Sequence, residues 1–336
     1  MCRKILAVCL VLLLLLMMLG GCGQKNSAMT KIRLNEVTHS IFYTPMYAAI
    51  NEGYFAEAGL EIELTNGAGA DKVMTALLSD QADIGLMGPE ATVYVYNEGK
   101  SNYIVNFAQL TNGDGTFLIS RQPEPDFKWS NLKGKTIIGG RIGGMPEMTL
   151  EYVLNKQGLV PNQDLEVLTN IQFALTAGAF TGGTGDYVAL FEPVASQMEL
   201  ANQGYVVASL GLEAGEVPYT VFSASQSYIA DHQEVIQKFT TALAKAQQWV
   251  QEASAQEVAL AIKASFPDTD EALLISAINR YRDQGSWAKT PVFTESAFDR
   301  LQDIMTDAGQ LDQRAPYKDL VTNLYAEQAL KELGGK

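Results

Sequence analysis

An alternation of strands, loops and helices from residue 31 to about residue 225 constrains the fold of this chain more than any other feature. Apolar segments predict strands at 31–37, 61–65, 83–87, 103–110, 117–120, 136–139, 187–191, 205–210 and 219–224. Helices are expected between many of them, for example from Pro45 to Glu52, where Gly53 stops the helix. Because this order needs crossover connections, it predicts mostly parallel sheets covered by helices.

The pattern changes after about residue 230, where the sequence predicts helices almost to its end. This tail is interrupted by three prolines, Pro267, Pro291 and Pro316. Its first helix is expected to be capped by the pair of Asp231 and Glu234. A chain of this length can bury a substantial core, which we expect to be split over two lobes.

The N-terminus predicts export and lipid anchoring. Arg3 and Lys4 precede an uncharged run of about 15 residues, which ends in Leu-Gly-Gly-Cys at 19–22. Small residues before a Cys match the bacterial lipobox, so we expect residues 1–21 to be a signal peptide and Cys22 to carry the lipid. The alternative is a transmembrane anchor, but the run is shorter than the roughly 20 residues that cross a bilayer as a helix. Residues 22–30 are expected to form a flexible tether.

Removal of such a signal changes the charge and the thiol content. The formal net charge of −14 becomes two units more negative, and of the three cysteines only Cys22 remains, where it is lipidated. No disulfide is then expected, although the compartment would permit one. The acidic balance and the absence of a basic stripe argue against a nucleic-acid partner.

Four short segments carry a family resemblance. They are Gly-Tyr-Phe at 53–55 with Gly-Leu-Glu at 59–61, Ala-Asp-Ile-Gly at 82–85, Leu-Lys-Gly-Lys-Thr at 132–136, and Gly-Asp-Tyr-Val-Ala at 185–189 with Glu-Pro at 192–193. With these segments, over roughly residues 32–225, the chain resembles the solute-binding proteins of ABC importers. The nearest branch is the one that binds sulfonates, taurine, nitrate or thiamine-precursor pyrimidines.

This resemblance implies a type II-like periplasmic-binding-protein fold: two α/β lobes, joined by crossing strands, with the ligand between them. Lobe 1 is expected at 31–117 and 219–336, including the helical tail, and lobe 2 at 118–218. The implied partners are a small solute, a permease with its ATPase, and the membrane through Cys22. We expect a monomer on the extracytoplasmic face.

We expect no enzymatic activity, no cofactor and no metal. Only His39 and His232 are available, no free Cys remains, and no Ser-His-Asp or metal-binding pattern is evident. Two alternatives stay open: a sensor domain, and an enzyme like those that make a thiamine precursor.

Residues just after strands are candidates for ligand contact, because ligands bind at the carboxyl ends of strands in open α/β sheets. Phe42 and Tyr43 are expected to stack on a planar ligand, or else to pack in the core or hinge. His39 is a ligand contact or a structural residue. Backbone near Gly67 is a ligand contact or an ordinary turn, and Glu90 is a ligand contact or a cap for its own helix.

In the second lobe, a loop with four glycines at 139–144 precedes a helix that opens at Pro146. Such a loop suits an anion, and Arg141 and Gly143 are its candidates, with an ion pair as the alternative for Arg141. Its spacing fits no dinucleotide or phosphate-loop motif. Glu192 is expected to accept hydrogen bonds from a ligand amino group, or to cap the helix after Pro193.

Two ligand classes follow from these residues. Aromatic side chains with acids favour a planar, neutral or amino-bearing molecule such as a pyrimidine. Arg141 and the helix at Pro146 favour a sulfonate or a carboxylate. Asn112 and Asp114 lie near the expected first crossing and are expected to shape the hinge.

Overall fold

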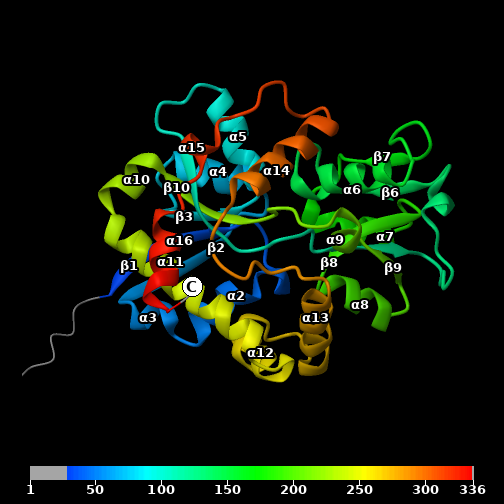
Figure 1. Cartoon of the computed structure of the whole chain (residues 1–336). Coiled ribbons are helices and arrows are strands. Elements are labelled where there is room, and N and C mark those ends of the chain that lie inside the picture. The colour runs from blue at the N-terminus through cyan, green and yellow to red at the C-terminus, as the bar shows by residue number, and fades with distance from the viewer. Residues whose placement is uncertain (1–28, 335–336) are drawn as a thin grey trace, which may run out of the picture.

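Two lobes that lie side by side make up the described part of the chain (Figure 1). A computed structural model describes residues 29–334, so the predicted signal peptide, Cys22 and nearly all of the predicted tether lie outside the described residues. Between residues 29 and 334, no helix has both the length and the apolar character that a membrane span requires.

Lobe 1 is built on a five-stranded sheet in the order β2-β1-β3-β10-β4. Its strands are β1 (Thr30–Glu36), β2 (Leu60–Asn66), β3 (Ile84–Met87), β4 (Ile104–Gln109) and β10 (Val221–Ser225). β1 pairs in parallel with β2 and β3, whereas β10 runs antiparallel to both β3 and β4. The sheet is therefore parallel except for β10, the strand that returns from lobe 2.

Lobe 2 has a second five-stranded sheet in the order β7-β6-β8-β5-β9. Its strands are β5 (Thr116–Ser120), β6 (Thr136–Ile138), β7 (Glu166–Leu168), β8 (Tyr187–Phe191) and β9 (Tyr205–Ser209). Here β5 is the reversed strand, and it is the one that arrives from lobe 1. The expected fold, two mostly parallel sheets flanked by helices, is confirmed.

Helices fill the connections between strands, and the boundaries of several follow directly from the sequence. In lobe 1 they are η1 (Ile41–Tyr43), α2 (Thr44–Asn51), α3 (Tyr54–Glu57), α4 (Ala70–Leu78) and α5 (Glu90–Asn97). In lobe 2 they are η2 (Trp129–Leu132), α6 (Met145–Lys156), η3 (Phe173–Leu175), α7 (Thr176–Thr181), α8 (Val194–Leu200) and α9 (Leu210–Ala214). Pro45 and Pro146 each stand in the first turn of their helices, where a missing N–H costs nothing.

The C-terminal tail is helical, as expected. It comprises α10 (Gln226–Asp231), α11 (Gln233–Glu252), α12 (Ala255–Ile262), η4 (Lys263–Ser265), α13 (Glu271–Asp283), α14 (Glu295–Asp307), α15 (Tyr317–Leu320) and α16 (Leu324–Glu332). The predicted capping pair is wrong, because Asp231 ends α10 and no side chain caps α11. Glu234 instead pairs with Lys238, 2.7 Å away.

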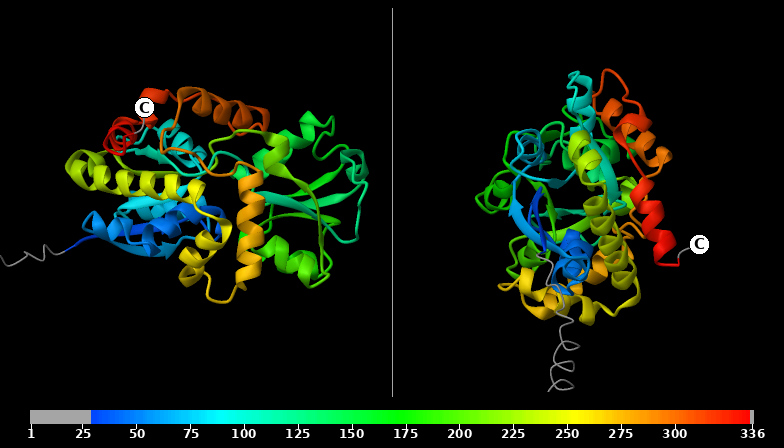
Figure 2. Two further views of the ribbon diagram at one scale, coloured as in Figure 1. Left: turned by 60° about the horizontal axis from the view of Figure 1, so that its bottom comes forward. Right: turned by 90° about the vertical axis from the view of Figure 1, so that its left-hand side faces the viewer.

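The tail does more than complete lobe 1. α11 packs on α2 and α3, and Phe239 contacts the rings of Phe55, Phe107 and Phe222. α13 and α14 lie beside both lobes (Figure 2), and α14 contacts both α5 of lobe 1 and α6 of lobe 2. The tail therefore also bridges to lobe 2.

Three chain segments run together between the lobes. The hydroxyls of Thr111 and Thr220, one in each crossing, are 2.6 Å apart, and the Thr220 N–H donates to Thr111 Oγ1 at 2.9 Å. The segment after α13 joins them, because the Asn112 N–H donates to the Ser286 carbonyl at 2.8 Å. The lobes are thus linked by three chain segments that hydrogen-bond to one another.

Candidate functional site

A cavity of about 590 Å³, including space open to solvent, lies between the two lobes. Segments that follow strands of both sheets line it, as expected for ligand sites in α/β sheets. Lobe 1 and the second crossing contribute Tyr43, Glu90 and Tyr219, and lobe 2 contributes apolar and aromatic side chains and one base: Arg141, Met145, Pro146, Phe173 and Phe191.

Aromatic rings form much of the wall. Phe173 of η3 meets Phe191, at the end of β8, with a centroid distance of 5.4 Å and an interplanar angle of 66°. Tyr219, in the second crossing, lies 6.1 Å from Phe191 in a similar edge contact. A planar molecule between the lobes would therefore meet ring faces and edges, which favour aromatic ligands.

Tyr43 supplies a neutral hydroxyl. Its side chain is buried, and burial raises its pKa well above the ordinary value, with further increases from the charges of Glu36, Glu90 and Asp114. The phenol stays protonated at physiological pH and can donate a hydrogen bond into the cavity.

Glu90 is the acid that lines the cavity. It opens α5 and is only 2% exposed, and its Oε2 has no hydrogen-bond partner among the residues described. Burial raises its pKa to about 7, although the backbone N–H groups of Glu90, Met145 and Ala91 and the charge of Arg141 act in the opposite direction. A Cβ on Gly88 would lie 2.0 Å from Oε2, so glycine at this position makes room for the carboxyl.

A second buried acid stands behind Tyr219. Asp114, in the first crossing, is fully buried, and its Oδ1 accepts hydrogen bonds from the N–H and the hydroxyl of Thr116, both at 2.6 Å. Its Oδ2 and the Tyr219 hydroxyl have no hydrogen-bond partner at standard geometry within residues 29–334, but Tyr219 lies near enough to lower the Asp114 pKa as a donor would. Burial raises the pKa of Asp114 to about 7 against the effect of these donors.

Contacts across the cleft hold the lobes together on one side of the cavity. Arg141 Nη1 lies 3.2 Å from Asp71 Oδ1, with the two side chains 40% and 54% exposed. The Tyr94 hydroxyl donates to the Gly143 carbonyl at 3.0 Å, while the Gly143 N–H donates to Glu147 at 3.0 Å. Arg141 thus lines the cavity and also forms an ion pair, and Gly143 contributes to closure outside the lining.

Phe42 lies behind the cavity. It is fully buried and contacts the rings of Tyr43, Phe191, Tyr219 and Tyr281. The position of Phe42 corresponds to its alternative role, packing in the core or hinge. Tyr43, in contrast, lines the cavity.

His39 and Gly67 also lie outside the lining. His39 Nδ1 is 2.9 Å from Glu36 Oε1 and Nε2 is 2.8 Å from the Ser265 carbonyl, and the Glu36 hydrogen bond raises the His39 pKa. This is the structural role given as its alternative. A Cβ on Gly67 would lie 2.6 Å from Asn35 Oδ1, so the turn is tight, and the nearby Gly69 lines the cavity instead.

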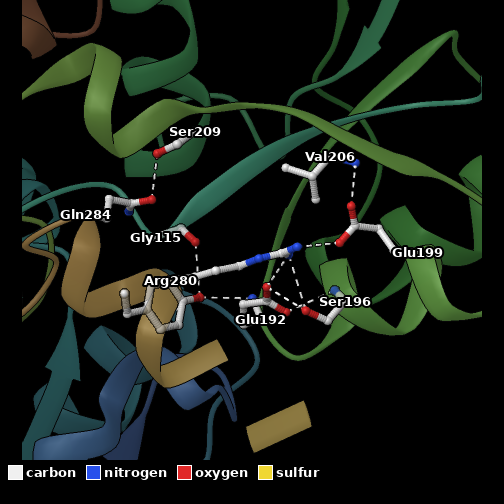
Figure 3. A network of polar contacts seen from close by, with 9 residues as sticks. Gly115, Glu192, Ser196, Glu199, Val206, Ser209, Arg280 and Gln284 are labelled. Carbon is white, nitrogen blue, oxygen red and sulfur yellow. Dashed lines mark hydrogen bonds and ion pairs between the residues drawn. The ribbon is translucent and has the colours of Figure 1, made fainter. Parts of the chain in front are cut away.

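The Glu192 carboxylate is occupied by protein donors (Figure 3). It accepts hydrogen bonds from the N–H and hydroxyl of Ser196 at 3.0 and 2.9 Å, and from Arg280 of α13 at 2.8 Å. Arg280 also reaches Glu199 at 2.5 Å, and the Tyr281 hydroxyl is 2.9 Å from the Glu192 N–H, which donates to it. These contacts correspond to the alternative given for Glu192, a cap for α8, because its carboxylate accepts the Ser196 N–H in the first turn of that helix. Glu192 does not line the cavity.

Several lining residues were not singled out from the sequence, among them the large side chains of Tyr219, Phe173, Phe191 and Met145. Tyr219 was placed inside a strand, but β10 begins at Val221, so Tyr219 belongs to the crossing. A shorter strand beginning after the Pro-Tyr-Thr segment at 218–220 would have placed Tyr219 in the crossing beside the hinge, in an irregular segment of the kind that often carries binding residues.

The two buried acids predict an unusual dependence of stability on pH. Their pKa values are about 7 when folded, against ordinary values of 4.5 for Glu and 3.8 for Asp, so the native state holds protons that the unfolded state releases. Their contribution to stability is therefore complete at low pH and is lost as pH rises through about 7. We expect Glu90→Gln to reduce this loss, measured by urea unfolding at about pH 5 and about pH 8. An unchanged difference between the two pH values in Glu90→Gln would contradict the assignment.

Comparison with known proteins gives one family and a close curated relative. A family model described as NMT1/THI5 like matches residues 41–256. The curated Bacillus subtilis (strain 168) protein named "Putative binding protein YtlA" is 46% identical over 324 residues. That match covers 96% of this chain and 97% of the relative.

Solved structures share the fold at low identity. The alkanesulfonate-binding protein SsuA from Xanthomonas axonopodis pv. citri, bound to MOPS, has a TM-score of 0.72 at 16% identity, covering 88% of this chain and 99% of that chain. The periplasmic nitrate-binding protein NrtA from Synechocystis PCC 6803 has a TM-score of 0.70 at 15% identity, covering 91% and 89%. At these identities the likeness shows the fold, which is that of periplasmic binding proteins.

Proposed function

Because the chain belongs to the NMT1/THI5-like family, we propose that it is the solute-binding component of an ABC importer. The observation that carries this proposal is the cavity between the lobes, which both sheets face and which Tyr94 and Arg141 help to close. Structural neighbours that bind alkanesulfonate and nitrate support it. Closure of two lobes around a solute is a recurrent way to present a loaded state to a partner.

The solute that we propose is a small planar heterocycle of pyrimidine type. Phe173, Phe191, Tyr43 and Tyr219 would contact its ring, and the buried carboxyl of Glu90 would accept a hydrogen bond from an exocyclic or ring nitrogen. Glu192, which was the candidate for this contact, has its oxygens satisfied by Ser196 and Arg280. We therefore assign the hydrogen bond with the ligand nitrogen to Glu90.

A sulfonate or carboxylate remains the second candidate, because Arg141 and the start of α6 both line the cavity. A helix N-terminus and a guanidinium favour anions. Two features weigh against this candidate. Asp71 already neutralises Arg141, and the buried carboxyl of Glu90 would repel a negative group.

We further propose that the mature protein is a monomer anchored on the extracytoplasmic face of the membrane by lipid on Cys22, near a permease and its ATPase. The lipobox sequence supports this anchor, and the intact mass of protein extracted from membranes checks it. We propose no enzymatic role. The alternative function is that of a sensor domain. A measurement of solute uptake distinguishes a sensor from a transport protein.

Deletion of the gene tests the importer role. We first identify, by mass spectrometry after denaturation, the small molecule that purifies with the protein, since enclosed cavities retain tightly bound solutes. Deletion is then expected to abolish high-affinity uptake of that molecule, and the wild-type gene to restore it. Unchanged uptake in the deletion strain would contradict the importer role and would leave the sensor alternative.

A further inference from the structure

A buried polar atom without a partner belongs to the wall of the cavity. Glu90 Oε2 has no hydrogen-bond partner in the described part of the chain. Asp114 Oδ2 and the Tyr219 hydroxyl also lack a partner at standard geometry, but these two groups lie near enough for each to shift the pKa of the other as a hydrogen-bonding neighbour. Buried polar groups are normally paired, because leaving one unpaired costs about 1–3 kcal/mol and more when it is charged. The unpaired oxygen of Glu90, on a residue that lines the cavity, therefore indicates a place where a ligand completes a hydrogen bond.

Glu90 and Asp114 give this part of the cavity wall a negative charge once they are ionised, which their pKa values of about 7 place near neutral pH. Tyr43, Glu90 and Tyr219 line the same cavity, and the charges of Glu90 and Asp114 both raise the pKa values of the two phenols. The groups that act on Asp114 are Thr116 and Tyr219, and neither is a cation. Glu90 does face a cation, Arg141, but that side chain is 40% exposed and already pairs with Asp71.

The surrounding surface suits a flat cation. Phe173 and Phe191 line the same cavity, and ring faces attract positive charge. A cationic nitrogen hydrogen-bonded to Glu90 would pair the buried carboxylate, which otherwise has no complete partner. With a neutral molecule the carboxyl keeps its proton and no ion pair forms, and an anion adds repulsion once the carboxyl is ionised.

We propose that the solute carries a positively charged planar nitrogen group, of amidinium or protonated aminoheterocycle type, which binds Glu90 in the cavity that Tyr43 and Tyr219 also line. Asp114 lies behind Tyr219 and acts through it as a positioning residue. This inference rests on the proposed solute-binding function and adds to it the charge of the solute.

Three molecules of nearly the same shape test the charge preference: benzamidinium, benzamide and benzoate. Binding is measured by calorimetry, and by ligand-observed NMR at millimolar concentration. We expect benzamidinium to bind more tightly than benzamide, and benzoate to bind least. Equal or tighter binding of benzamide or benzoate, or no binding of benzamidinium, would overturn the proposal.

Variants locate the effect. Glu90→Gln is expected to weaken benzamidinium binding about ten- to hundredfold, the range for one charged hydrogen bond, with little change for benzamide. Asp114→Asn is expected to weaken it less, because Asp114 acts through Tyr219. Glu63→Gln, an exposed acid on β2, is the matched control and should leave binding unchanged. Equal affinities in the wild type and Glu90→Gln would exclude the assigned site.

The identity of the natural solute separates this inference from the proposed function. If the molecule that purifies with the protein is neutral or anionic and is imported, the importer role stands and the inference about charge fails. If benzamidinium binds at Glu90 but deletion leaves uptake of the natural solute unchanged, the importer role fails and the charge preference stands.

Discussion

Replacing Arg280 by alanine is expected to destabilise the protein by about 3–5 kcal/mol, the usual cost of removing one partner of a buried ion pair. Glu192 is fully buried, and Arg280 supplies its charged partner at 2.8 Å. The same guanidinium reaches Glu199 at 2.5 Å, so the substitution leaves one buried and one half-buried carboxylate without their cation. Urea unfolding followed by circular dichroism measures the loss.

A matched control separates this effect from the loss of any arginine. Arg314 pairs with Asp303 at 2.9 Å, but the two side chains are 48% and 56% exposed, so Arg314→Ala is expected to cost no more than about 1 kcal/mol. The double variant Arg280→Ala with Glu192→Gln should recover part of the loss, because it removes the stranded charge. If Arg280→Ala lowers the free energy of unfolding no more than Arg314→Ala does, the ion pairs between Arg280 of α13 and lobe 2 contribute little to stability.

Phe42→Ala is expected to cost about 3–5 kcal/mol, as large-to-small substitutions of buried aromatic residues do. The ring of Phe42 is fully buried and lies 5.2–5.6 Å from four other rings, one of them in lobe 2 and one in α13. Its removal leaves a hole where both lobes, a crossing and the tail meet. We therefore expect a loss of solute affinity together with the loss of stability, measured by urea unfolding and calorimetry.

Leu200→Ala is the control for Phe42, because Leu200 is 73% exposed and its truncation should change stability by less than about 0.5 kcal/mol. Phe42→Leu keeps most of the volume and serves if the alanine variant does not fold. A loss below about 1 kcal/mol in Phe42→Ala would show that the ring cluster is not a cooperative part of the core.

Local sequence patterns predicted most of the strands and the helical tail, whereas the two-lobed arrangement came from the family resemblance. Strand boundaries at β3, β4 and β8 fall within a residue or two of the predictions, and each limit of α2 falls within one residue of the predicted one, but β7 was missed. These elements are short, apolar and bounded by Gly, Pro or acids, so their signals are local. The capping pair at Asp231 and Glu234 failed because an additional short helix, α10, ends at Asp231.

The candidate site was harder to predict, because its residues meet only after the lobes come together. Tyr43 and Glu90 follow strands of lobe 1, and Arg141 follows a strand of lobe 2, so strand ends were a sufficient guide for these three. Glu192 also ends a strand, but its partner Arg280 lies 88 residues further along the chain. The contact of Glu192 with Ser196 is local and corresponds to the helix cap that the sequence offered as an alternative, but nothing local to Glu192 could show the contact with Arg280.

The position of β10 between β3 and β4 has a consequence for the order in which this protein is made. All five strands of lobe 2 lie between residues 116 and 209, so they emerge before β10 does. Lobe 1 must wait, with the edges of β3 and β4 open, until the chain has been synthesised past residue 225. Open strand edges are templates for aggregation. The edges of β3 and β4 therefore stay open to pairing with other chains until β10 has been made, which is after every strand of lobe 2.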